Sequence, residues 1–144
     1  MHDTVVLLVD DEADFVEIMS KRLRKRAFHV EVAYSGPEAL EVLKKTEKVD
    51  IVLLDVKMPG MDGVEALSRI KEHSPLVEVI MLTGHATVDS AVEGLKLGAF
   101  DYLMKPCDIK VLMQKLNAAM ERRQEQVEKA LEARTDDIIL RHGR

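Results

Sequence analysis

The side chains that could do chemistry in this chain stand at the ends of short apolar runs. Two adjacent aspartates, Asp10 and Asp11, follow one run, and a third, Asp55, ends another. Thr83 and Lys105 follow two more. Three ionised carboxylates brought together repel one another unless positive charge lies among them. A lysine can supply one charge and a divalent cation more, and hard oxygen ligands suit Mg²⁺. A carboxylate beside such an ion can attack phosphorus and form an aspartyl phosphate.

Short apolar runs alternate with helix-like segments along the chain. The run from Val5 to Val9 is unbroken and mostly β-branched, which is typical of a strand buried on both faces. Ser35 is the expected cap of a helix, with Pro37 in its first turn and Glu38 completing a capping box. The predicted strands are 5–9, 28–33, 51–54, 77–82 and 100–104, and the other predicted helices are 13–27, 64–73, 86–97 and 108–140.

This alternation predicts an α/β fold, a doubly wound five-stranded parallel sheet with helices on both faces and right-handed connections. In such sheets the functional site lies at the carboxyl ends of the strands. Taken singly, the aspartate pair could cap a helix and the other groups could be turns. Their shared position at one end of successive strands favours a common site. Phosphoryl transfer needs a nucleophile, a metal, a cation and a hydroxyl donor. The sequence offers a nucleophile in Asp55, metal ligands in Asp10 and Asp11, a cation in Lys105 and a hydroxyl in Thr83.

Four motifs in combination resemble the receiver domain of bacterial two-component response regulators. They are Val9-Asp10-Asp11-Glu12, the segment 53–63, Leu82-Thr83-Gly84-His85 and the segment 98–106. The resemblance covers residues 3 to 122, and residues 82 to 106 are most similar to receivers of the nitrogen-regulation class of activators. It implies a flavodoxin-like (βα)5 fold with strand order 2-1-3-4-5, here with an extended C-terminal helix.

The resemblance also implies roles at the acidic site. Asp55 would accept a phosphoryl group from a sensor histidine kinase or a histidine phosphotransfer protein, and Mg²⁺-dependent autodephosphorylation would remove it. Asp10, Asp11 and Asp55 would hold the Mg²⁺ together with the backbone carbonyl of Lys57. A protein of this kind is not a conventional enzyme, because it catalyses only its own phosphotransfer and dephosphorylation.

A switch is implied by the remaining motif residues. Lys105 would contact the phosphoryl oxygens, and its bond to Pro106 is expected to be cis. Thr83 would move to hydrogen-bond the phosphate while Tyr102 turns inward. The output face would be the surface of the fourth helix, fifth strand and fifth helix, where a downstream protein binds. The fourth helix is intrinsically weak, which suits a switch, although Gly94 could equally serve only to relieve crowding.

Length and charge exclude several classes of protein. The 144 residues suit one domain, and the net charge of −5 argues against direct contact with nucleic acid. Cys107 is the only cysteine, so an internal disulfide is impossible and a reducing compartment is expected. The N-terminus does not resemble a signal peptide, and no apolar stretch has the length of a membrane span. We therefore expect a cytoplasmic protein that does not contact a membrane.

The expected division is a receiver domain over 1–122 and a helical extension or linker over 123–144. The extension could be a homodimerising helix, a linker to a larger protein or a frayed tail, and its heptad pattern is poor. Because no output domain is evident in these residues, a stand-alone or single-domain regulator is expected.

Two other functions fit part of the pattern. A haloacid-dehalogenase-type phosphatase also forms an aspartyl phosphate, but its nucleophile follows the first strand with a second aspartate two residues later. Here the first strand ends in Asp10-Asp11-Glu12. A receiver that has lost phosphorylation and acts as a scaffold is the second alternative, and the complete set of site residues argues against it.

Overall fold

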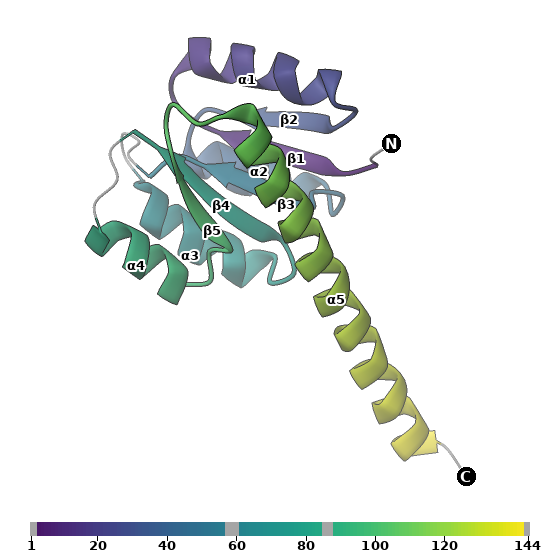
Figure 1. Cartoon of the computed structure of the whole chain (residues 1–144). Coiled ribbons are helices and arrows are strands. Elements are labelled where there is room, and N and C mark those ends of the chain that lie inside the picture. Colours follow the sequence, from purple (N-terminus) through teal and green to yellow (C-terminus); the bar gives the residue numbers. More distant parts are fainter. Residues whose placement is uncertain (1–2, 57–60, 85–87, 143–144) are drawn as a thin grey trace.

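Five strands and five helices alternate in the computed structural model of the chain, which describes residues 3–56, 61–84 and 88–142 (Figure 1). The elements are β1 (Val5–Val9), α1 (Ala13–Lys25), β2 (His29–Ala33), α2 (Gly36–Lys45), β3 (Ile51–Leu54), α3 (Gly63–His73), β4 (Glu78–Thr83), α4 (Val88–Lys96), β5 (Asp101–Met104) and α5 (Ile109–His142). Within the described ranges, no helix combines the length and apolar character needed to cross a membrane.

The strands form one sheet in the order β2-β1-β3-β4-β5, and every neighbouring pair is parallel. Both the predicted doubly wound topology and the predicted strand order are confirmed. Because β1 and β3 are neighbours at the centre, the residues that follow them lie side by side.

Aliphatic side chains fill one core on each face of the sheet. Leu7 and Val9 of β1 point into the core beneath α2 and α3, whereas Val6 and Leu8 point into the core beneath α1 and α5. This alternation follows from the two-residue period of a strand. Figure 1 shows the two helical layers and the sheet between them.

Several predicted boundaries move by one or two residues. Helix α1 ends at Lys25 rather than Ala27, because Ala27 takes a left-handed backbone with φ of 68°. Ser35 caps α2 as predicted, and its Oγ accepts from the Glu38 amide at 3.2 Å. The Glu38 carboxylate accepts from the amide of Tyr34 at 2.7 Å, one residue before the cap rather than at the cap itself.

The long helix α5 has a docked part and a protruding part. Leu112, Leu116 and Ala119 are fully buried against the sheet. From residue 128 to 140 every side chain is exposed, and the helix extends well beyond the domain (Figure 1). Its 34 residues correspond to about 50 Å at the usual helical rise.

Two groups of ion pairs fasten α5 where it leaves the domain. Glu78, 3% exposed at the start of β4, lies 3.2 Å from Arg122 Nε and 3.9 Å from Lys71 Nζ. Arg123 lies 3.4 Å from the carboxylate of Asp50, whose other oxygen accepts from the Val5 amide at 2.9 Å. Burial lowers the pKa of Lys71, a shift that Glu78 opposes and Arg122 increases. These contacts mark the last docked turn of the helix.

Removal of the residues after Arg123 is therefore expected to leave the domain folded. The free energy of unfolding in urea should change by less than about 0.5 kcal/mol, because the side chains removed are largely exposed. As a positive control, Glu78→Ala should lower the free energy of unfolding by about 2 kcal/mol, because the variant removes the buried partner of two cations. The loss is not larger because both cations reach solvent. A truncated chain that fails to fold would show that the extension belongs to the core.

Candidate functional site

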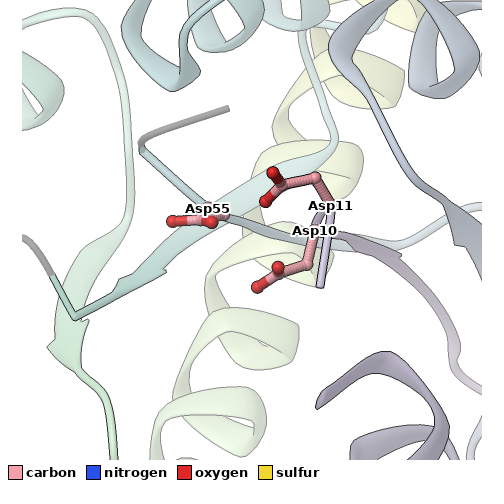
Figure 2. A group of neighbouring side chains, drawn as sticks. All are labelled: Asp10, Asp11 and Asp55. Carbon is pink, nitrogen blue, oxygen red and sulfur yellow. The ribbon is translucent and has the colours of Figure 1, made fainter. Parts of the chain in front are cut away.

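Three carboxylates meet at the carboxyl edge of the sheet (Figure 2). Asp10 and Asp11 follow β1, and Asp55 follows β3. Each offers an oxygen within 4.8 Å of an oxygen of the others. Asp10 and Asp55 are buried, with exposed fractions of 1% and 3%, while Asp11 is exposed. The predicted convergence of these residues is therefore present in the fold.

Backbone hydrogen bonds hold the two buried aspartates in place. The amide of Asp55 donates to the Val9 carbonyl at 3.0 Å, and the amide of Asp10 donates to the Ala33 carbonyl at 3.1 Å. These bonds extend the parallel ladders by one residue past the strand ends. The Oδ1 atom of Asp10 accepts from the Glu12 amide at 2.9 Å. The carboxylates are thus presented by the sheet rather than by mobile loops.

Gly63, the first residue of α3, lies directly against the chain that follows Asp55. Its amide donates to the Val56 carbonyl at 2.6 Å. A Cβ atom at this position would collide with the carbonyl of Asp55 and the Cα of Val56. Asp62 caps the same helix and accepts from the Glu65 amide at 2.9 Å. Only glycine allows the helix to start so close to the site.

Lys105 places its ammonium group among the carboxylates. Its Nζ is 2.5 Å from Asp10 Oδ2, 3.4 Å from Glu12 Oε1 and 3.9 Å from Asp55 Oδ2. Burial lowers the pKa of Lys105, but the hydrogen bond to Asp10 and the charges of Asp10, Asp55 and Glu12 outweigh it and raise the pKa above its ordinary value. The lysine therefore stays charged at neutral pH. The Lys105–Pro106 bond is cis, as expected.

The two predicted switch residues lie on the neighbouring strands β4 and β5. Thr83 is fully buried, and its carbonyl accepts from the Lys105 amide at 2.9 Å. Tyr102 is partly buried and packs against the core beneath α2 and α3. Its hydroxyl is buried and has no hydrogen-bond partner within the described part of the chain. A Cβ on Gly94 of α4 would collide with the thioether of Met81, so this glycine does relieve crowding.

Two neighbours of Lys105 were not recognised in the sequence as site residues. Glu12 pairs with its ammonium, and the ring centroid of Phe15 lies 4.1 Å from its Nζ. Both stand beside the aspartate pair, but the sequence gives no signal that a lysine about ninety residues later reaches them. The remaining predicted metal ligand, the carbonyl of Lys57, lies outside the described residues.

The donor set suits a hard divalent cation. The three clustered aspartates offer carboxylate oxygens only, and two of them are buried. One lysine supplies less positive charge than three carboxylates require. Oxygen-only donor groups with an exposed side suit Mg²⁺, which keeps several of its waters.

Comparison with known proteins decides the family. Residues 6–117 match the family described as the response regulator receiver domain. The chain belongs to the response regulator receiver family. Receiver domains of this family act in two-component signalling as phosphoacceptors, and the chain is close to receivers of the nitrogen-regulation activators.

Curated relatives and solved structures agree. The chain is 43% identical over 116 residues to the transcriptional regulatory protein ZraR of Klebsiella oxytoca, covering 80% of this chain and 26% of that protein. It is 35% identical over 142 residues to the DNA-binding transcriptional regulator NtrC of Escherichia coli, covering 96% of this chain and 30% of that protein. A receiver domain protein from Clostridium thermocellum superposes with a TM-score of 0.82 at 33% identity, covering 85% of this chain and 98% of that one. The chain thus spans less than a third of these curated relatives.

Proposed function

We propose that this receiver is a phosphorylation-dependent switch that accepts a phosphoryl group on Asp55 from a sensor histidine kinase or a histidine phosphotransfer protein. The observation that carries the proposal is the position of the Asp55 carboxylate. It is buried at the carboxyl edge of the sheet, with Asp10, Asp11 and the Lys105 ammonium grouped around it. This arrangement supports nucleophilic attack in a setting that can neutralise charge.

In the transfer step, one carboxylate oxygen of Asp55 forms a bond to phosphorus. The bond from phosphorus to the donor's histidine nitrogen breaks, and that nitrogen keeps the electron pair. Lys105, already charged and close to Asp55, is placed to contact the phosphoryl oxygens as negative charge gathers on them. Later attack of water on phosphorus regenerates the Asp55 carboxylate and releases inorganic phosphate.

Asp10, Asp11 and Asp55 would hold Mg²⁺, with the carbonyl of Lys57 as a further ligand. The bound ion would supply the positive charge that lets the phosphoryl group approach three carboxylates. The protein orients the oxygens through the strand-end hydrogen bonds of Asp10 and Asp55. Beyond its own phosphotransfer and dephosphorylation we propose no enzymatic activity.

The output of the switch would be the surface formed by α4, β5 and α5. Thr83 and Lys105 would bind the phosphoryl oxygens, and Tyr102 would turn further inward as Thr83 moves. Val92, Leu95 and Met104 already expose large apolar side chains on these elements. Such a surface suits a downstream protein partner or a second copy of the chain.

For the organisation of the chain we propose a receiver over 1–122 and a helical linker over 123–144. The linker would connect the switch to an output function or pair with a second copy in a homodimer. The relatives are named as transcriptional and DNA-binding regulators, so a DNA-directed output would be reached through such a linker. The acidic receiver itself would contact neither nucleic acid nor membrane, and we place it in the cytoplasm.

Incubation with acetyl phosphate tests the proposal. With Mg²⁺ present, intact-mass spectrometry should show one phosphoryl group per chain. When EDTA chelates the Mg²⁺ beforehand, almost no labelling should occur, because the three clustered carboxylates then repel the donor. Ca²⁺, which prefers longer bonds and more ligands, serves as the matched metal control and should support less labelling. A folded chain that takes up no phosphoryl group would favour a scaffold that keeps the residues without the chemistry.

A further inference from the structure

The ring of Phe15 lies beside the ammonium of Lys105, and the proposed phosphotransfer does not use it. The Nζ atom is 4.1 Å from the ring centroid. Phe15, in the first turn of α1, is partly buried and packs against the core beneath α1 and α5. The ring is therefore held by the fold, independently of the charges in the site.

The other partners of Lys105 are carboxylates, and two of them, Asp10 and Asp55, are also the proposed ligands of the metal. Asp10 uses Oδ2 for Lys105 and Oδ1 for the Glu12 amide. A metal ion that takes a lone pair of Asp10 draws electron density from the same carboxylate, which weakens its hydrogen bond to Lys105. The Glu12 side chain is 65% exposed, so its ion pair with Lys105 is weak. A lysine side chain has four rotatable bonds and moves away readily when its partners weaken.

Phe15 is the neighbour of Lys105 that has no ligand atom to offer a metal ion. An aromatic face attracts an ammonium group through its quadrupole, and the attraction is stronger where water is excluded. The Lys105 side chain is only 13% exposed. The ring can therefore hold the ammonium both when Lys105 bonds to Asp10 and after that bond loosens.

We propose that Phe15 is a positioning residue, which keeps the Lys105 ammonium directed at Asp55 through a cation–π contact while metal binding draws Asp10 away. The inference rests on the proposed phosphotransfer at Asp55. It differs from a role as apolar filler beneath the lysine stem, for which any aliphatic side chain of similar volume would serve. The two roles differ in what they predict for Phe15→Leu, which removes the ring, whereas Phe15→Tyr keeps it.

The first readout needs neither metal nor phosphate. Protons above an aromatic face are shifted upfield, so the ε-methylene protons of Lys105 should resonate upfield of those of exposed lysines in the NMR spectrum. Phe15→Tyr should keep that shift, and Phe15→Leu should abolish it. A Lys105 signal that is ordinary in the unmodified protein would overturn the contact.

The second readout is the rate of phosphorylation by acetyl phosphate at saturating Mg²⁺, since this small donor avoids any effect on kinase docking. Phe15→Leu should slow it roughly tenfold, while Phe15→Tyr stays within about twofold of the unmodified protein. The Mg²⁺ concentration for half-maximal rate should not rise. Equal rates for all three proteins, or equal losses in both variants, would overturn the inference.

Two controls keep the test decisive. If Phe15→Leu does not fold, Phe15→Met replaces it, because methionine fills a similar volume without an aromatic face. Ile18→Ala, at an exposed position on the same helix, should change neither readout. A lack of labelling in the unmodified protein would refute the proposed function, whereas the NMR shift would still decide whether Phe15 holds Lys105.

Discussion

Asp55→Asn is expected to abolish the phosphoryl adduct and to leave the fold intact. The amide that replaces the carboxylate has no nucleophilic oxygen of comparable strength, while its size and shape are the same. The backbone bond from residue 55 to the Val9 carbonyl does not involve the side chain, so the strand end keeps its geometry. Loss of one of three clustered negative charges should also raise the free energy of unfolding, by on the order of 1 kcal/mol.

Intact-mass spectrometry after incubation with acetyl phosphate and Mg²⁺ measures the first effect, and urea unfolding measures the second. Asp62→Asn is the matched control, because Asp62 is exposed nearby and asparagine caps a helix as well as aspartate does. The control should label like the unmodified protein. Stoichiometric labelling of Asp55→Asn at a single site would show that the acceptor is another residue.

Lys105→Ala is expected to separate phosphorylation from the conformational response. The variant should still form an adduct, more slowly, because Asp55 keeps its carboxylate and the metal ligands remain. Without the ammonium 3.9 Å from Asp55, the phosphoryl oxygens would lose the proposed contact that connects β5 to the site. The position of Thr83 and Tyr102 would then depend little on the phosphate.

Amide hydrogen exchange over residues 83–102 measures this response. In the unmodified protein exchange should change on phosphorylation, and in Lys105→Ala the change should be nearly absent at equal adduct levels. Lys110→Ala, which removes an exposed lysine five residues later, should respond like the unmodified protein. An undiminished response in Lys105→Ala would refute a signalling role for this lysine.

Local signals in the sequence were enough for most of the fold. The apolar run Ile51–Leu54 has the predicted bounds, because a strand buried on both faces is an unbroken run of such residues. The cap at Ser35 depends on residues within one helical turn, so it too was predicted. The predicted end of α1 lies two residues too late, because Ala27 takes a left-handed backbone that an alanine does not normally indicate.

Contacts between segments far apart in the chain could not be predicted from the sequence. Strand β4 includes Thr83 because its partner in the register is Met104, and pairing is a property of the assembled sheet. Glu78 is buried in that strand, where its charge is balanced by Lys71 and by Arg122 from α5. At the site, strand order explains why the aspartates converge, but the ring of Phe15 over Lys105 depends on side-chain directions that no spacing encodes.

The most direct test of phosphorylation at Asp55 is to locate the phosphoryl group chemically. The chain is phosphorylated with acetyl phosphate in Mg²⁺ and reduced with sodium borohydride, which converts an aspartyl phosphate to homoserine, and its peptides are then mapped by mass spectrometry. We predict homoserine at residue 55 alone, and almost none when Mg²⁺ is chelated. Homoserine at residue 10 or 11, or a phosphate that survives reduction on another type of side chain, would contradict it.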